Sequence, residues 1–135
     1  MLEQVKPILE QKYNSEMSKF EELKKQIEEY EDKFKNDTSE KDYQDNLKFL
    51  NKRYGLFKKG SKEYKEELNN LMLEYNQKLE QFNTDYNDYI ELKNQAAKIN
   101  VYVIQKKLEQ LMNANSLEDL KMSEEEATRI LSEGV

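Results

Sequence analysis

The chain is 135 residues long, so it forms one domain at most. Charged residues make up 37% and hydrophobic residues 36%, whereas ordinary globular proteins have roughly 25% and about 45–50%. This composition excludes a thick multilayered core but supplies one apolar stripe along each long helix. The absence of histidine and cysteine excludes Ser-His-Asp and Cys-His catalysis, disulfides, and metal sites that need either residue.

Residues 2–34 are predicted to form the first part of a helical arm. Apolar side chains recur at spacings of three, four and seven residues, as in the a/d seam of a coiled coil. They are Leu9, Phe20, Leu23, Ile27, Tyr30 and Phe34. Because proline is well tolerated only in the first turn of a helix, we expect the regular helix to begin near Val5 to Pro7.

The stretch 36–40 interrupts this pattern and leaves two alternatives. Asp37, Thr38 or Ser39 could cap a new helix, and Asp42 would complete a loose capping box after Ser39. No glycine or proline occurs here, so a helix that runs straight through is equally consistent with the sequence. In both cases the apolar pattern resumes with Tyr43, Leu47, Leu50, Tyr54 and Phe57.

The segment Gly55–Gly60 is the predicted turn between two arms, because two of the three glycines bracket it. Ser61 is a favourable N-cap for the second arm, and Tyr64 would make its first apolar contact. A helical stripe then continues to the breaker-rich residues near Asn113. We therefore expect arms of about 3–54 and 61–112, the second being one helix of roughly fifty residues and about 75 Å.

Folding back at this turn would produce an antiparallel hairpin. With a midpoint near residue 58, the numbers of facing residues add up to about 116. The predicted pairs are Phe34–Phe82, Tyr30–Tyr86, Ile27–Tyr89, Tyr13–Val103 and Leu9–Leu108, with Phe20 opposite Ala96 and Ala97. Neighbouring registers would match apolar residues almost as well, so the sequence supports the hairpin more strongly than any one pair.

Residues 114–135 are predicted to form a separate short helical segment after the hairpin of residues 1–113. Two capping-box patterns begin at Ser116 and Ser123. The helix after the second box has a short apolar face that includes Ile130 and Leu131. Since so short a helix is marginal alone, it either packs on its own hairpin or binds a partner through these two residues.

Positive charge is concentrated around the turn. Seven basic residues and one acid lie between Lys48 and Lys65, a net charge of +6, while the whole chain has a formal charge of −6. The candidate partner-binding residues at this tip are Lys52, Arg53, Leu56, Phe57, Lys58, Lys59 and Lys62. Such a tip could contact an acidic protein groove, a phosphate backbone or an anionic membrane surface. The alternative is an exposed loop whose lysines only aid solubility.

These features predict an all-α fold, a long coiled-coil-like antiparallel helical hairpin with a short C-terminal helix. We expect a non-enzymatic interaction protein, acting as adaptor, spacer, assembly factor or inhibitor, with no catalytic residues, metal or cofactor. A protein partner and a homo-oligomer are expected, and a nucleic-acid-associated protein that uses only the tip is the alternative. No apolar run is long enough to span a membrane and no signal-peptide pattern is present, so we expect a cytoplasmic protein, with signal-peptide-independent export left open.

In outline the chain resembles two groups of helical proteins. Paired-helix partners of type VII secretion carry Trp-x-Gly at the turn and a tyrosine followed four residues later by an acid. This chain has Tyr54-Gly55 at the turn, no tryptophan, and no tyrosine with an acid at that spacing. Phage scaffolding proteins share an acidic coiled coil with a short helical tail. A helical-hairpin secretion partner and a phage morphogenesis factor are therefore further alternatives.

Overall fold

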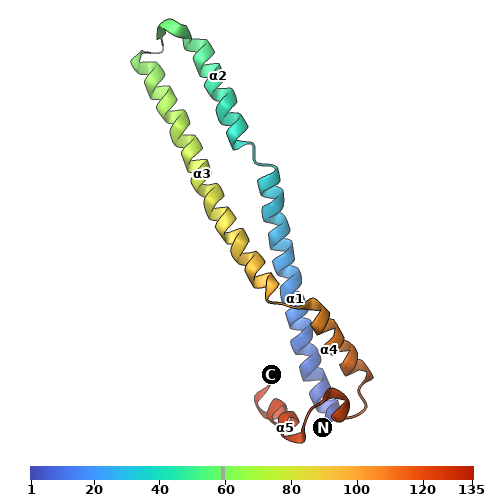
Figure 1. The fold of residues 1–135 in the computed structure, drawn as a ribbon. Coiled ribbons are helices and arrows are strands. Elements are labelled where there is room, and N and C mark those ends of the chain that lie inside the picture. Colours follow the sequence, from blue (N-terminus) through green and yellow to red (C-terminus); the bar gives the residue numbers. More distant parts are fainter. Residues whose placement is uncertain (59) are drawn as a thin grey trace. The chain divides into compact units, whose positions relative to one another are not determined.

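The computed structural model describes residues 1–58 and 60–135, without the side chains of residues 56–58. All regular elements in this part of the chain are helical, which confirms the predicted all-α class. In chain order they are α1 (Leu2–Lys35), α2 (Ser39–Lys58), α3 (Lys62–Ala97), α4 (Val101–Asn113), the 3-10 helix η1 (Glu118–Leu120) and α5 (Glu124–Glu133) (Figure 1). The chain divides into two compact units, which we call the hairpin unit (Ile27–Glu91) and the terminal unit (Met1–Gln26 with Leu92–Val135).

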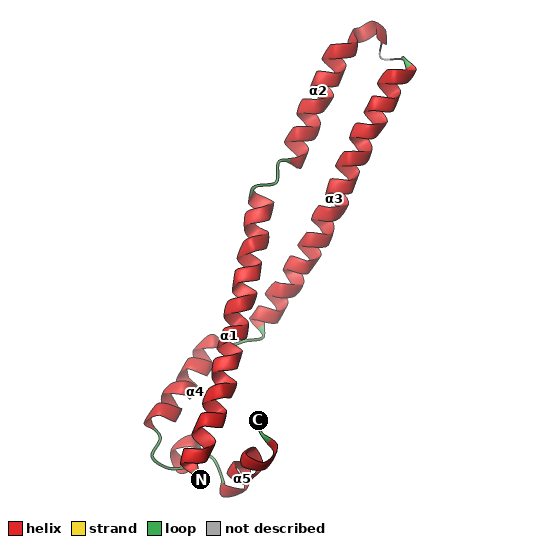
Figure 2. Cartoon of the chain, turned by 180° about the vertical axis from the view of Figure 1, so that it is seen from behind, coloured by secondary structure: helices red, strands yellow, loops and turns green. Residues whose placement is uncertain are grey.

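In the hairpin unit, the end of α1 and the whole of α2 run antiparallel to α3 (Figure 2). Phe34 lies at the centre of an aromatic cluster between the two sides. Its ring centroid is 5.0 Å from that of Phe82, 5.4 Å from Tyr89, and 6.1 Å from both Tyr30 and Tyr86. The predicted contact between Phe34 and Phe82 is therefore confirmed.

Nearer the tip, the register differs from the predicted one by two residues. If the numbers of facing residues add up to about 116, Tyr43 should lie opposite Leu73. Instead, Tyr43 stacks on Tyr75, with ring centroids 4.5 Å apart. Leu73 is left 59% exposed. The stacked rings bury more apolar surface in a thin two-helix core than a tyrosine–leucine pair would, and stacking adds its own attraction.

The first arm breaks between α1 and α2, so the alternative of one continuous helix is excluded. The Asp37 carboxylate accepts hydrogen bonds from the backbone N–H of Ser39, at 2.8 Å, and from the Ser39 hydroxyl. The Thr38 hydroxyl donates to Asp42 at 3.0 Å. These side chains provide hydrogen-bond partners for polar groups at the start of α2. The helix can therefore restart here without a glycine or proline.

The turn between α2 and α3 depends on one glycine. Gly55 has φ 67° and ψ −175°, a conformation inside the range of α2 that is essentially restricted to glycine. Regular helical geometry is therefore interrupted there. On the other side, the Ser61 hydroxyl accepts the backbone N–H of Tyr64 at 3.2 Å, which confirms the predicted cap of α3.

In the terminal unit, α1 begins at Leu2 and includes Pro7, so the predicted start near Val5 to Pro7 is wrong. Proline within a helix removes one backbone hydrogen bond. Val5 and Leu9, on either side of it, are both buried, with 0% and 5% of their surface exposed. Burial of these two side chains holds the helix together across the proline.

The second arm was predicted to be one helix, and this prediction is wrong. The structure has two helices there, since α3 ends at Ala97 and α4 begins at Val101. Asn100 lies just before α4, and its side chain accepts the backbone N–H of Val103 at 3.2 Å. An asparagine that satisfies a free helix donor favours a new helix start over continuation. This cap is the physical reason for the break.

The C-terminal helix α5 packs on its own chain. Ala127 and Ile130 join Val5, Leu9 and Leu111 in one buried cluster, with Leu108 packed against it. The Ser123 hydroxyl accepts the backbone N–H of Glu126 at 3.2 Å, as the capping box predicted. Burial in this cluster stabilises a helix that would be marginal alone. Residues 114–135 thus belong to the same compact unit as the start of α1.

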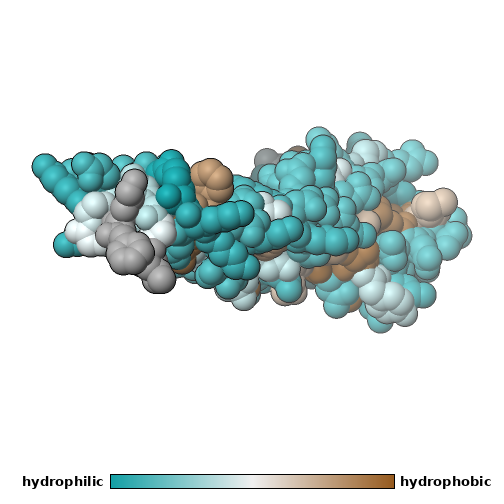
Figure 3. Space-filling view, turned by 90° about the horizontal axis from the view of Figure 1, so that it is seen from above, coloured by the Kyte–Doolittle hydropathy of each residue, from teal (hydrophilic) through white to brown (hydrophobic). Residues whose placement is uncertain are grey.

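Hydrophilic side chains cover most of the face that Figure 3 shows, with a few apolar groups between them. Within the described ranges, no helix has an apolar stretch that is long enough to cross a bilayer.

Candidate partner-binding surface at the hairpin tip

The structure describes the predicted tip only on the two flanks of the turn. Lys52 and Arg53 are exposed near the end of α2, and Lys62 is exposed at the first residue of α3. The predicted residues that lie outside the described part are the side chains of Leu56, Phe57 and Lys58 and the whole of Lys59. The three described cations all face solvent, as a binding surface requires.

Two acids on α3 neutralise part of the tip's positive charge. Arg53 forms an ion pair with Glu67, and the Lys62 ammonium lies 4.0 Å from a Glu66 carboxylate oxygen. Both acids follow Lys65, where the basic stretch of the sequence ends, so counting charge along the chain misses them. The α3 flank of the tip is consequently less positive than the sequence indicates.

Two lysines on α2 carry positive charge that no ion pair among the described residues offsets. Lys48 and Lys52 are exposed, and neither forms an ion pair with any residue that the structure describes. They lie four residues apart, which is about one helical turn, so their charges add on neighbouring parts of one surface. An anionic partner would meet this flank first.

The two tyrosines near the turn, Tyr54 and Tyr64, pack between the helices. The ring centroids of Tyr54 and Tyr64 are 5.6 Å apart in an edge-to-face arrangement, and Tyr64 is buried. The Tyr64 hydroxyl donates to the side-chain oxygen of Asn51 at 2.6 Å. These contacts close the end of the two-helix layer, so these rings do not form an open platform on which bases could stack.

An exposed phenylalanine that sequence reasoning missed lies beside a hollow near the tip. Phe49 on α2 is 66% exposed. It borders a hollow of about 310 Å³ between α2 and α3, whose apolar lining includes Leu50 and Leu71. The signal was present in the sequence, because Phe49 falls outside the apolar stripe that Leu47 and Leu50 continue.

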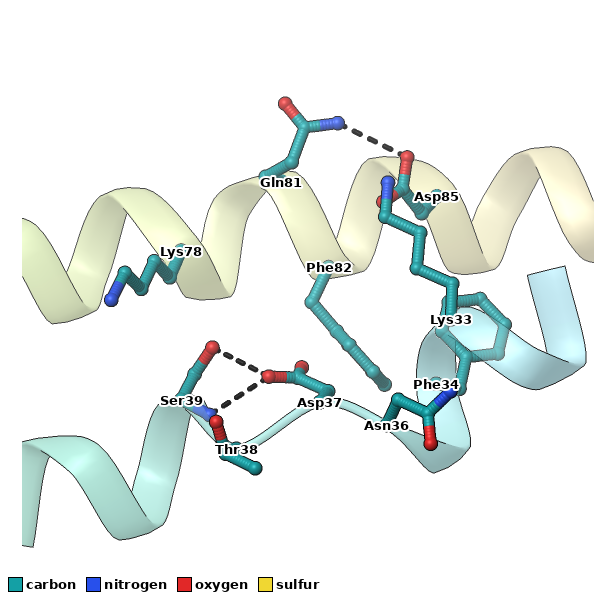
Figure 4. A pocket seen from close by; sticks show the side chains of 10 residues that line it. All are labelled: Lys33, Phe34, Asn36, Asp37, Thr38, Ser39, Lys78, Gln81, Phe82 and Asp85. Carbon is teal, nitrogen blue, oxygen red and sulfur yellow. Dashed lines mark hydrogen bonds and ion pairs between the residues drawn. The ribbon is translucent and has the colours of Figure 1, made fainter. Parts of the chain in front are cut away.

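A second hollow, of about 450 Å³, lies beside the break between α1 and α2 (Figure 4). The Lys33 ammonium reaches across to Asp85 on α3, with 2.6 Å between its nitrogen and a carboxylate oxygen. The other Asp85 oxygen accepts a hydrogen bond from the Gln81 amide at 3.0 Å. Asp85 is only 7% exposed, which makes it the buried charged residue of the described chain.

Hydrogen bonding determines how the charged groups of this hollow titrate. The hydrogen bond from Lys33 lowers the pKa of Asp85 and outweighs the opposing effect of burial, and the same bond raises the pKa of Lys33. The Ser39 hydroxyl and backbone N–H lower the pKa of Asp37. Both carboxylates therefore stay ionised near neutral pH. This pattern is typical of structural pairing, whereas a general acid or base needs a pKa near the working pH.

The sequence analysis did not single out Asp85 among the many acidic residues. Its position was informative, because it lies three residues after Phe82 and four before Tyr89, on the apolar stripe. An acid at such a position must find a partner or remain uncharged. Only the fold shows that Lys33 is that partner.

The predicted C-terminal binding residues have different surroundings. Ile130 is 7% exposed and belongs to the buried cluster of the terminal unit, whereas Leu131 is 38% exposed. A partner could therefore reach Leu131 directly, but would reach Ile130 only if α5 moved away from that cluster.

The fold and these surfaces define an all-α protein of paired antiparallel helices with exposed charged and apolar side chains near one turn. In the described ranges, no group of three or more acidic side chains is gathered where it could hold a metal ion. Comparison with protein-family models, with curated proteins and with solved structures finds no match.

Proposed function

We propose that this protein is a non-enzymatic interaction protein that binds a protein partner through the tip of its helical hairpin. The observation that supports this most directly is the exposed α2 flank, where Lys48 and Lys52 have no ionic partner among the described residues and Phe49 is mostly exposed. A surface with both cations and an apolar ring fits an acidic protein groove with an apolar centre. A cytoplasmic location is part of this proposal.

The competing function is association with nucleic acid at the same tip. Exposed lysines favour phosphate contacts, and the acidic remainder of the chain would confine them to the tip. However, the tip tyrosines Tyr54 and Tyr64 are occupied in the core, and Arg53 is paired with Glu67. Base stacking and arginine contacts, which commonly strengthen such binding, are therefore weakened here.

Self-association also belongs to the proposal. Apolar side chains stay exposed in both units, among them Phe49 and Leu73 in the hairpin unit and Tyr102 and Met112 in the terminal unit. Two-helix layers bury too little apolar surface to cover every side chain, and oligomers commonly provide the missing cover.

The test is capture of partners from host extract by the intact protein and by a variant in which Lys58 and Lys59 are both replaced by Glu. A matched control replaces Lys24 and Lys25, exposed on α1, and so changes the net charge equally. We expect a nuclease-resistant protein partner that the control variant retains and the tip variant loses. Retention by the tip variant would refute binding through the tip.

Nucleic acid is tested with the purified protein. Binding to labelled single- and double-stranded oligonucleotides is measured by fluorescence anisotropy while salt is raised from about 50 to about 200 mM, a range over which several phosphate contacts would weaken binding steeply. We expect no binding at either salt concentration. Salt-sensitive binding that the Lys58/Lys59 variant loses would favour the nucleic-acid function instead.

A further inference from the structure

The exposed face of α2 carries an apolar side chain between two opposite charges. Phe49 is at its centre, Asp45 lies one turn before it, and Lys52 lies one turn after it. All three are exposed. Spacings of four and three residues place them along one stripe of the helix. This stripe is not covered by the rest of the hairpin unit.

Both charges of this stripe are unpaired within the part of the chain that the structure describes. Neither Asp45 nor Lys52 forms an ion pair with a residue in the described part of the chain. Along α2, the acid Asp45 comes before Phe49 and the base Lys52 comes after it. When a second copy of the helix runs in the opposite direction, the acid of each copy therefore lies opposite the base of the other. A two-fold axis through the centre would then set each Asp45 against Lys52 of the other copy, with both pairs on the same side of the interface.

The same face offers a place for the ring. The hollow of about 310 Å³ between α2 and α3 borders Phe49, and Leu50 and Leu71 contribute to its lining. The hollow is also lined by Asn46, Arg53, Glu67, Asn70 and Glu74, so its apolar part is the floor that the two leucines provide. A protruding ring and a hollow with this apolar part beside it, both on one surface, satisfy the condition for a self-complementary contact. Each copy can provide and receive a ring in the same interface.

We propose that two copies of this protein pair through α2 in antiparallel orientation, with each Phe49 resting against the hollow of the other copy and Asp45 facing Lys52 across the interface. The proposal rests on the self-association included in the proposed function but not on partner binding at the turn. The partner that occupies this face is a second copy, because only an antiparallel copy of α2 brings Lys52 opposite Asp45 and Asp45 opposite Lys52.

Other ways of pairing two copies are less favourable, because of the charges on this face or because they leave Phe49 exposed. In a parallel pair, each Lys52 would lie against the other Lys52 and each Asp45 against the other Asp45, which is repulsive at both ends. A contact through the exposed Leu73 on α3 would leave Phe49 and its hollow uncovered.

The first experiment measures mass as a function of concentration by sedimentation equilibrium. The chain mass is 16.3 kDa, and we expect a concentration-dependent approach to twice that value. Phe49→Ala should weaken the dimer by about tenfold or more, since a central aromatic ring commonly dominates a small interface. Leu73→Ala, a similarly exposed apolar side chain, is the matched control and should leave the dimer unchanged. A monomer at all concentrations, or an unaffected Phe49→Ala dimer, would overturn the proposal.

The second experiment exchanges the charges. Asp45→Lys and Lys52→Asp should each weaken the dimer, because each creates two like-charged contacts, and the double variant should restore it. Lys65→Asp on α3 makes the same charge change as Lys52→Asp away from the stripe and should have no effect. A double variant no better than either single variant contradicts the Asp45–Lys52 pairing.

The orientation is tested by cross-linking, which the absence of cysteine in the chain makes clean. A mixture of Asp45→Cys and Lys52→Cys variants should form an intermolecular disulfide faster than either variant alone. Faster cross-linking by each variant alone would indicate a parallel pair and overturn the proposal. The Lys58/Lys59 variant should still dimerise, so failure of the tip hypothesis and failure of this one are distinguishable.

Discussion

Replacement of Phe34 by alanine tests the packing of the hairpin unit most directly. Four aromatic rings surround Phe34, and the closest, Phe82, comes from the opposite side of the hairpin. Full burial of a phenylalanine is worth about 1.5–3 kcal/mol. Because Phe34 is mostly buried, most of that value applies, and the contact with its nearest ring, Phe82, adds about 0.5–1.5 kcal/mol. We therefore expect Phe34→Ala to lower the free energy of unfolding by about 2–3 kcal/mol.

The free energy of unfolding is measured by urea denaturation, followed by circular dichroism, at low protein concentration. Since the chain has two compact units, amide hydrogen exchange along α3 should locate the loss in the hairpin unit. Phe82→Ala and the double variant complete a cycle, in which we expect a coupling of at least about 0.5 kcal/mol.

Phe49→Ala is the matched control, because the same substitution is made at an exposed phenylalanine. Its effect on the free energy of unfolding should stay within about 0.5 kcal/mol. If Phe34→Ala lowers the free energy of unfolding by no more than Phe49→Ala does, the aromatic cluster does not hold the two sides of the hairpin together. A coupling of zero between Phe34 and Phe82 would show that their contact contributes nothing beyond burial.

Two further predictions concern the ion pair and the C-terminal helix. Because the pKa of Asp85 is lowered in the folded chain, its contribution to stability is present above the ordinary value of 3.8 and lost as the pH falls through the folded pKa. Asp85→Asn should therefore flatten the acid side of a urea-stability profile measured from neutral to acidic pH, and an unchanged profile would contradict a stabilising pair. Ile130→Ala should lower stability by about 2–4 kcal/mol, because Ile130 is buried, while Leu131→Ala at the neighbouring exposed position should change it by less than about 1 kcal/mol. Equal effects of the two substitutions in urea denaturation would contradict the packing of α5 on α1.

Several parts of the fold could be predicted because they depend on local interactions. The caps at Ser61 and Ser123 each need only one side chain and a backbone N–H three residues later. The turn at Gly55 needs a residue that tolerates positive φ. Such signals can be read directly from a few neighbouring residues.

The errors at Pro7 and Asn100 occurred where two local signals compete. At Pro7, the proline signal indicated a helix start, but burial of Val5 and Leu9 outweighs the lost hydrogen bond. At Asn100, the apolar stripe indicated one long helix, but the asparagine cap favoured a new start. Neither balance can be judged without knowing what the helix packs against.

The candidate surfaces were predicted less completely. The sequence indicated the basic tip, but the pairing of Arg53 with Glu67 and of Lys62 with Glu66 became visible only in the structure. Phe49 was missed because it does not belong to the apolar stripe, and that same property leaves it exposed. Partner binding by the tip and by Ile130 and Leu131 stays a prediction.

The sequence by itself determined the helical class, the turn and the caps of this protein, since composition, apolar period and capping act within a few residues of each other. Only the tertiary structure decided the register of Tyr43 on Tyr75, the burial of Asp85 against Lys33, and the packing of Ile130 on α1. The physical reason is that an apolar stripe repeats along each helix, so neighbouring registers bury nearly the same apolar surface. The choice among them depends on specific contacts between residues that are far apart in the chain.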